Sequence, residues 1–279
     1  MKLGVLSDIH SAWRPLEVCL KALKARGAEG FLLLGDYISD CPEPEKTMDL
    51  LRELMAEYPC FAVKGNREEY VLDWRAGKCP DWFYGSGSGS LLYTAENLSA
   101  ASYEWFEGLP ITRLVELPGC APLRICHGGP GKTRQLLWAD SNEARQVLEG
   151  LDTDYLLGGH CHKQVVFRWQ GRTLFNPGAV RGFNTAQCGL LTSREGGWDA
   201  ELLMLSYDAE RYADEIAGSE FAKKAPMWAK ALEYELRHGV DALEALVVKS
   251  WKHIRALDHP NEDEQEQCWR QAAKELGII

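Results

Sequence analysis

The sequence contains no long apolar stretch and no excess of positive charge. No segment of its 279 residues offers about 18 uninterrupted apolar side chains, so we expect no membrane-spanning helix. The first acidic residue, Asp8, comes too early for a signal peptide. The formal net charge of -10 at pH 7 gives no general electrostatic attraction to nucleic acid. These absences predict a cytoplasmic protein that has neither a membrane nor a nucleic acid as its partner.

Cysteine occurs nine times, but the spacing that marks a thiolate metal site is missing. There is no C-x-x-C pair, and several of the cysteines lie inside apolar runs. We therefore expect reduced, buried thiols rather than disulfides or a structural zinc site. Cys161 lies between two histidines, and its predicted role is packing.

Side chains that can bind metals follow five short apolar runs. The runs have the composition of buried parallel strands and cover residues 3–6, 31–34, 61–63, 123–126 and 155–157. In an open α/β sheet, ligands bind at the carboxyl ends of the strands, so we expect the side chains that follow the runs to gather at one edge. These side chains belong to Asp8, His10, Asp36, Asn66, His127, His160 and His162.

The pattern of helices and strands divides the chain near residue 207. Helices predicted over 13–26 and 43–58 alternate with the first three runs, which calls for a parallel sheet covered by helices. After His162 the pattern implies a second sheet, made of short antiparallel strands at 165–169, 173–175, 189–192 and 200–205. The rest is helical in pattern. We therefore predict one domain over 1–207 and a helical C-terminal extension over 208–279.

Two further segments have more than one interpretation. Trp228, Trp251 and Trp269 in the extension are predicted to pack in a small core of their own, with a cap over the first domain or a dimer surface as alternatives. The last alternative implies a homo-oligomer formed through the extension. Residues 85–90 alternate Gly and Ser, which predicts a flexible surface loop, with a mobile lid beside the metal site as the alternative.

The predicted ligands mix carboxylate and amide oxygens with imidazoles and include no thiolate. Such a set suits Mn²⁺, Fe or Zn²⁺ in a catalytic role better than structural zinc. We predict two divalent cations, with Mn²⁺ as the first choice and Fe, Zn²⁺ or Ni²⁺ as alternatives. Asp36, on the tight Gly35-Asp36 turn, is the predicted bridge, because two cations about 3.5 to 4 Å apart need a shared anion. Water between the cations would ionise near neutral pH and attack a phosphate ester as hydroxide.

The ordered motifs resemble those of the calcineurin-like metallophosphoesterases. The family motifs D-x-H, G-D, G-N-(H/C)-(D/E), H-G and G-H-x-H are similar to Asp8-Ile9-His10, Gly35-Asp36, Gly65-Asn66-Arg67-Glu68, His127-Gly128 and Gly159-His160-Cys161-His162. The segment Asn176-Pro177-Gly178-Ala179-Val180 is similar to the N-P-G-S-V segment of the YfcE-like phosphodiesterase branch. The resemblance covers Asp8 to about Val180.

The resemblance implies a fold and a division of the ligands. The implied fold is an α/β four-layer αββα sandwich, in which two mixed β-sheets are flanked by helices. One metal would take Asp8, His10, Asp36 and His162. The other would take Asp36, Asn66, His127 and His160.

Arg67 departs from the family motif, where many members carry His and the YfcE-like branch often carries Cys. An arginine stays protonated, so it can bind a phosphoryl group but is a poor proton donor. We therefore predict that Asn66 and Arg67 bind substrate, that Asp36 and Arg67 act in catalysis, and that esters with good leaving groups are preferred. In the alternative interpretation, Arg67 turns away and pairs with Glu68 or Glu69.

The predicted function is hydrolysis of phosphate esters by a dimetal centre. The substrate would be a small phosphorylated molecule, such as a nucleotide, and the enzyme a phosphodiesterase or phosphatase. One alternative is a protein-binding scaffold with little or no catalysis, similar to the retromer subunit of this family, which resembles a phosphoesterase but mainly binds other proteins. A protein Ser/Thr phosphatase is a third interpretation, which the acidic chain disfavours.

Overall fold

The computed structural model describes residues 1–279, and its ten strands form two five-stranded sheets. The first sheet has the order β10-β9-β1-β2-β3 and the second the order β4-β5-β6-β8-β7. The strands are β1 (Lys2–Leu6), β2 (Gly30–Leu33), β3 (Cys60–Ala62), β4 (Thr112–Val115), β5 (Leu123–Cys126), β6 (Tyr155–Leu157), β7 (Gln164–Trp169), β8 (Arg172–Pro177), β9 (Thr185–Arg194) and β10 (Gly197–Ser206).

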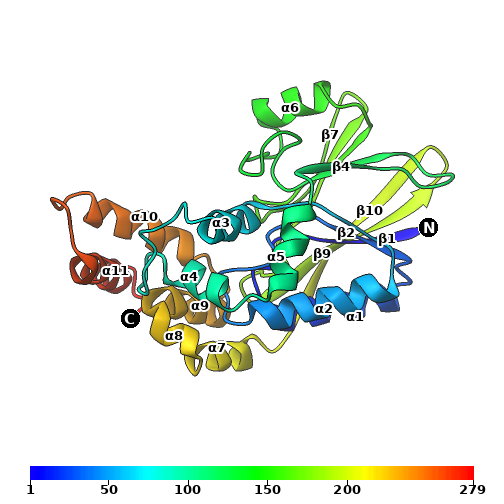
Figure 1. Cartoon of the computed structure of the whole chain (residues 1–279). Helices are drawn as coiled ribbons and strands as arrows, with labels where there is room; N and C mark the ends of the chain where they lie inside the picture. The colour runs from blue at the N-terminus through cyan, green and yellow to red at the C-terminus, as the bar shows by residue number, and fades with distance from the viewer.

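Helices cover the outer faces of the sheets and also form a separate group at one end of the molecule (Figure 1). In chain order they are α1 (Trp13–Ala25), α2 (Pro44–Glu57), α3 (Asn66–Arg75), α4 (Gly89–Glu96), α5 (Ala100–Gly108), α6 (Asn142–Glu149), α7 (Ala209–Ala217), α8 (Glu220–Lys224), α9 (Pro226–His238), α10 (Leu243–Ile254) and α11 (Glu262–Glu275). None of them is long and apolar enough to span a bilayer.

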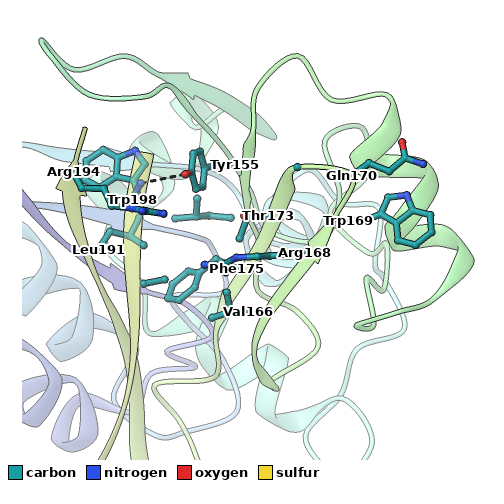
Figure 2. Close-up of a pocket in the computed structure, with 13 residues that line it drawn as sticks. Tyr155, Val166, Arg168, Trp169, Gln170, Thr173, Phe175, Leu191, Arg194 and Trp198 are labelled. Carbon is teal, nitrogen blue, oxygen red and sulfur yellow. Dashed lines mark hydrogen bonds between the residues drawn. The ribbon is translucent and has the colours of Figure 1, made fainter. Parts of the chain in front are cut away.

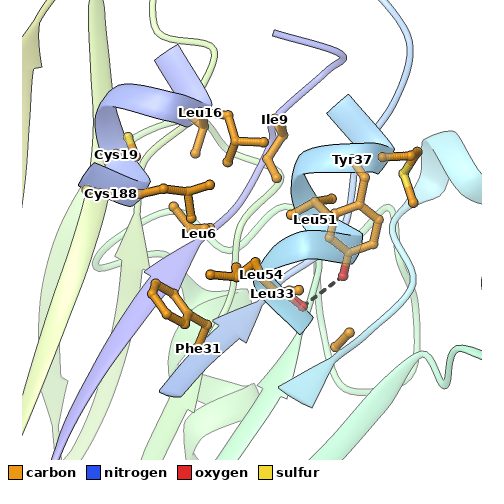
Figure 3. Packing of buried hydrophobic residues seen from close by; sticks show 14 of the residues in the cluster. Leu6, Ile9, Leu16, Cys19, Phe31, Leu33, Tyr37, Leu51, Leu54 and Cys188 are labelled. Carbon is orange, nitrogen blue, oxygen red and sulfur yellow. Dashed lines mark hydrogen bonds between the residues drawn. The ribbon is translucent and has the colours of Figure 1, made fainter. Parts of the chain in front are cut away.

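The alternation of side chains along β1 builds two different cores. Leu6 packs with Leu16 of α1 and Leu51 of α2 on the helix-covered face, as Figure 3 shows. Leu3 and Val5 point the other way and pack between the sheets with residues of the second sheet such as Phe175. Because successive strand residues face opposite sides, one short apolar strand serves both layers.

The predicted four-layer αββα fold is confirmed. The first sheet packs under α1 and α2, and the inner faces of the two sheets share the core that contains Val5 and Phe175. The outer face of the second sheet packs against α6 through Ala144, Leu148 and Leu156. The C-terminal helices are present as predicted.

The predicted sheet membership was wrong for several strands. β5 and β6 were expected beside the first three strands, but they belong to the second sheet. β9 and β10 were expected in the second sheet, but β9 pairs antiparallel with β1 in the first. The edge of β1 that β2 leaves free offers unpaired backbone groups, and the backbone of β9 pairs with them along residues 189–192. Residues 188–191 of β9 are buried without alternation, as in a strand covered on both faces. β4 was not predicted at all.

Helices α7 to α11 share a core in which Trp228 and Trp269 are buried, as predicted, whereas Trp251 is exposed. Ala12 and Cys41 of the preceding part of the chain belong to the same core. β10 ends at Ser206 and α7 begins at Ala209. The helical group therefore follows the sheets directly in sequence and packs against the segments that follow β1 and β2.

The Gly/Ser segment is not the exposed loop that its composition predicted. Ser86 is 1% exposed, and its hydroxyl donates to Glu266 of α11 at 3.0 Å and accepts from the backbone N–H of Met227 at 2.9 Å. The prediction was wrong because the composition reports only the absence of bulky side chains. Here that absence lets the backbone lie close to helices of the C-terminal group: a Cβ on Gly89 would approach the carbonyl oxygen of Lys224 to 2.3 Å.

Candidate metal centre

Six of the seven predicted ligands converge in two groups. Asp8, His10 and His162 form one group, and Asp36, His127 and His160 form the other. Within each group the ligand atoms lie within 4.8 Å of one another. The residues follow β1, β2, β5 and β6, which belong to both sheets. The predicted gathering at the carboxyl ends of the strands therefore holds, but the site lies where two sheets meet rather than at the edge of one.

The distances between donor atoms fit divalent cations. His162 Nε2 lies 3.2 Å from Asp8 Oδ1 and 3.1 Å from His10 Nε2. In the other group, His127 Nε2 lies 3.3 Å from Asp36 Oδ2 and 3.2 Å from Asn66 Oδ1, which places the seventh predicted ligand there. Ligands about 2.1 Å from one cation are roughly 3 Å apart, so these spacings suit nitrogen and oxygen coordination.

Asp36 lies between the two groups. Its Oδ2 is 3.3 Å from His127 Nε2 and 3.9 Å from His10 Nε2, although these histidines belong to different groups. The nearby histidines hold the pKa of the buried Asp36 carboxyl well below its usual range, despite the opposing effect of burial. A carboxylate that stays charged and contacts both groups has the position of a bridging ligand.

Five of the ligand residues have a left-handed backbone conformation, which residues other than glycine rarely adopt. The φ angles of Asp8, His10, Asp36, His160 and His162 lie between 52° and 63°, in the left-handed region. Each such residue costs about 1–3 kcal/mol, and such residues cluster at functional sites. The strain indicates that the fold is built to point these side chains at a common centre.

Two glycines allow the turns of the site to touch. A Cβ on Gly65 would lie 2.2 Å from Asp36 Oδ1, and a Cβ on Gly35, whose φ is +91°, would lie 2.6 Å from the backbone nitrogen of Gly65. No larger residue fits at either position without moving the turn that carries Asp36. The glycines of the G-D and G-N motifs are thus required by the close approach of β2 and β3.

Two of the imidazoles have acceptor oxygens outside the ligand groups beside their Nδ1 atoms. His127 Nδ1 donates to the carbonyl of Leu34 at 2.8 Å, which leaves Nε2 facing the site. His10 Nδ1 lies 3.3 Å from the buried carboxylate of Asp40, and burial lowers the pKa of His10 to about 3. Burial also opposes charge on His127, but Asp36 and Asp8 raise its pKa to about 10. A divalent cation would compete with that proton for Nε2.

Comparisons with known proteins agree with this geometry. The calcineurin-like phosphoesterase superfamily domain matches residues 1–194. The chain belongs to this superfamily. It is 22% identical over 245 residues to the uncharacterized protein MJ0912 of Methanocaldococcus jannaschii, a match that covers 81% of this chain and 94% of that protein.

Two solved structures share the fold of this phosphoesterase family member over most of its length. One is the hypothetical protein PH1004 from Pyrococcus horikoshii, with 17% identity, a TM-score of 0.69, and coverage of 83% of this chain and 97% of that one. The other is a metallophosphoesterase from Sphaerobacter thermophilus, with 20% identity, a TM-score of 0.66, and coverage of 86% and 100%. Both likenesses extend beyond residues 1–194, because they cover more than four fifths of the chain.

Arg67, which departs from the motif of the phosphoesterases, faces the site. Its Nη2 donates to Asp40 Oδ2 at 3.3 Å, and its Nε lies 3.9 Å from Asp36 Oδ2. Its backbone N–H donates to Asp36 Oδ1 at 2.8 Å. The structure therefore pairs Arg67 with Asp40 rather than with Glu68 or Glu69.

Several residues of the site carried no role in the sequence-based prediction. Glu68, although part of the motif, is buried and accepts from the backbone N–H groups of Gly65, Asp36 and Tyr37 at 2.8 to 3.0 Å. Asn176 donates to the carbonyl of Gly159 at 2.8 Å, beside the turn of His160 and His162. Glu68 and Asn176 lie in motif segments that could have revealed them. Asp40 lies in no motif.

A cleft of about 360 Å³ opens beside the metal ligands, and its lining includes Arg67, His160, His162 and residues of α10. A second cavity, of about 290 Å³, lies between the sheets and is shown in Figure 2. Its wall contains Phe175 and Trp198, whose backbone N–H donates to the Tyr155 hydroxyl at 3.2 Å. It contains none of the predicted ligands, so the candidate site is the first cleft.

Proposed function

We propose that this protein is a dimetal-dependent hydrolase of small phosphorylated molecules. The observation that carries the proposal is the pair of ligand groups that both contact Asp36. The chemistry that two bound divalent cations supply is neutralisation of phosphate charge and activation of water near neutral pH. The oxygen and imidazole donors favour Mn²⁺ as our first choice, with Fe, Zn²⁺ or Ni²⁺ as alternatives.

The residues of the chain have separate tasks in this proposal. Asp8, His10 and His162 hold one cation, and Asn66, His127 and His160 hold the other, while Asp36 is shared. Arg67 lines the cleft beside these ligands, where its guanidinium can donate two hydrogen bonds to a phosphoryl group. Asn66 can donate to the same phosphoryl group through its amide N–H, because its Oδ1 faces His127.

The charge of Arg67 limits the range of substrates. Asp40 and Asp36 outweigh burial and raise the pKa of Arg67 further, so its guanidinium stays protonated at every working pH. It can stabilise negative charge, but it cannot release a proton to a poor leaving group. The proposed enzyme therefore prefers esters whose leaving groups need no acid catalysis, such as aryl diesters.

A metal-reconstitution assay tests the proposal. Protein stripped with a chelator should regain hydrolysis of bis(4-nitrophenyl) phosphate with Mn²⁺, and much less of glycerol 2-phosphate, a simple alkyl monoester. Asp36→Asn should lower kcat/KM by at least about 100-fold, comparable to the loss of a charge-stabilising group elsewhere. Asp199→Asn is the control, because Asp199 is exposed on β10 and pairs only with Arg194.

Two results would count against the proposal. Hydrolysis that persists without metal, or that Asp36→Asn leaves intact, would remove the dimetal centre from the reaction. Equal turnover of the aryl diester and the alkyl monoester would contradict the role given to Arg67.

A further inference from the structure

The cleft beside the metal ligands is closed on its far side by the C-terminal helical group. Leu243, Val247 and Val248 of α10 line it, together with Trp228 of α9. The opposite wall comes from the loop after β5 and contains Leu136 and Trp138. These residues of α9 and α10 lie outside the matched range 1–194 and complete the cleft. Of the two cavities described above, this cleft is the one that reaches the metal ligands.

We propose that this cleft binds the organic group of the substrate, and that this group is planar, apolar and attached to a single phosphate. The inference rests on the proposed function, since it takes the phosphate to lie at the metal centre. It adds a specificity site made by α10 and the Trp138 loop.

The mouth of the cleft exposes large apolar side chains from both walls. Leu136 is 46% exposed, Trp138 is 44% exposed and Val248 is 65% exposed. Apolar side chains that gather around a concave site mark a surface that binds an apolar group. The flat face of the Trp138 indole favours a planar group, because stacked rings gain more than their buried area alone supplies.

Three residues that line the cleft have buried donors that form no hydrogen bond in the protein. Arg67 Nε, Arg181 Nε and Trp228 Nε1 are all buried and form no hydrogen bond, and all three residues line this cleft. Buried N–H groups normally have acceptors, so an acceptor that the protein does not supply belongs here. The oxygens of a phosphate ester are acceptors of this kind.

Acidic side chains on the α10 side set a limit on charge. Asp241 and Glu244 line the cleft near the start of α10, whereas the cations of the lining, Arg67, Lys163 and Arg181, belong to segments that carry or contact the metal ligands. A second phosphate that extended toward α10 would meet two carboxylates of like charge. The arrangement therefore favours one phosphate with an uncharged organic group over a polyphosphate chain.

The volume of the cleft limits the size of the ligand. About 360 Å³ lies near the lower end of the range of roughly 300–1,000 Å³ found for small-molecule sites. A phosphate and one ring system suit this space, whereas a polymer or a protein does not.

Two non-hydrolysable phosphonates test the inference on the full chain loaded with Mn²⁺. Phenylphosphonate and methylphosphonate have the same anionic group and differ only in the organic group. Calorimetric titration should show both binding, with phenylphosphonate bound at least about tenfold more tightly because its ring is buried against apolar walls. Trp138→Ala and Val248→Ser should each reduce this preference and leave the affinity for methylphosphonate unchanged. Trp138→Phe should keep most of it.

The control variant is Val240→Ser. Val240 is exposed in the same helical group but does not line the cleft, so its replacement should not alter the preference. Equal affinity of the wild-type protein for the two phosphonates, or an unchanged preference in both cleft variants, would overturn the assigned specificity site alone. Failure of both phosphonates to bind would overturn the proposed function together with this inference.

Discussion

Asp40 is buried, and its carboxyl group stays charged because two basic side chains lie beside it. It lies 3.3 Å from His10 Nδ1 and accepts a hydrogen bond from Arg67. Burial opposes its ionisation, but Arg67 and then His10 outweigh burial and lower the pKa of the carboxyl. The negative charge of a carboxylate beside a ligand imidazole raises the affinity of that imidazole for metal.

We expect Asp40→Asn to lower the affinity for Mn²⁺ by about 10- to 100-fold, because the amide keeps the shape of the side chain but loses its charge. Competition with a chromophoric chelator measures this affinity. Asp49→Asn serves as the control, since Asp49 pairs with Arg52 on the exposed side of α2. A variant that binds Mn²⁺ as the wild type does would show that Asp40 only fills space.

The metal ligands could be predicted from the sequence more readily than the residues that lie behind them, such as Asp40. Asp8, Asp36 and His127 each follow an apolar run, and the end of a strand fixes where such a residue lies. Asp40 lies four residues beyond Asp36 in an irregular loop, and its proximity to His10 depends on left-handed φ angles at several residues of both loops. Apolar periodicity carries no information about those angles.

Among the elements, the turn after β2 and the start of α3 are joined by one carboxylate. Glu68 Oε2 accepts from the backbone N–H groups of Gly65 and Asp36, and Oε1 accepts from that of Tyr37. Burial, and then the charge of Asp36, raise the pKa of Glu68 to about 7. Despite this raised pKa, the three backbone N–H donors need an acceptor oxygen at Oε1 and another at Oε2.

We expect Glu68→Gln to lower the free energy of unfolding of the metal-free protein. In either orientation of the amide, its NH₂ group faces at least one buried backbone N–H, a cost of about 1–3 kcal/mol. The loss of negative charge beside Asp36 offsets part of this cost, so we expect a net loss of about 1 kcal/mol.

Urea unfolding measures the effect of Glu68→Gln, with the exposed Glu53→Gln on α2 as a control that should change stability by less than about 0.5 kcal/mol. A variant more stable than the wild type would mean that repulsion between Glu68 and Asp36 exceeds the value of the hydrogen bonds.

The existence of the elements was predicted better than their pairing. The strands 123–126 and 155–157 were predicted from their apolar composition, and the structure contains both as β5 and β6. Their membership of the second sheet depends on contacts between residues far apart in the chain, such as Leu156 with Leu174. Local composition cannot distinguish which of several open strand edges such a strand will join.

At the scale of the whole molecule, one buried ion pair joins the segments that carry the candidate metal ligands to the helical group. Arg181 Nη1 donates to Glu235 Oε2 at 2.8 Å, and both side chains are buried. The backbone N–H of Arg181 donates to the carbonyl of Asp8, whereas Glu235 Oε1 accepts from Ala242 and Leu243 at the start of α10. The pair thus links a ligand turn to the helix that closes the cleft.

We expect Arg181→Met to destabilise the protein by about 3–5 kcal/mol, because it leaves the Glu235 carboxylate buried without a cation. The double variant Arg181→Met/Glu235→Gln should recover part of the loss, since Gln keeps an acceptor for Ala242 and Leu243 and has no charge. Urea unfolding measures these changes, with the fluorescence of the buried tryptophans of the helical group as the signal. The wild type should show a single transition.

Arg237→Met is the matched control for Arg181→Met, because Arg237 pairs with Glu210 and Asp214 on the exposed surface of the same group and should contribute no more than about 1 kcal/mol. A loss equal to that of this control would show that Arg181 does not hold the two parts together.

The pairing of β1 has a consequence for the biosynthesis of the protein. β1 lies between β2 and β9, and Lys2 pairs with Thr192, which is 190 positions later in the chain. A ribosome that adds roughly 5–20 residues per second needs roughly 10 to 40 s to make the segment between them. During that interval β1, which leads into the turn of Asp8 and His10, has one edge still open. The turn that carries Asp8 and His10 therefore reaches its final support only after β9 has been translated, so any cation that these residues hold meets its complete site no earlier than that.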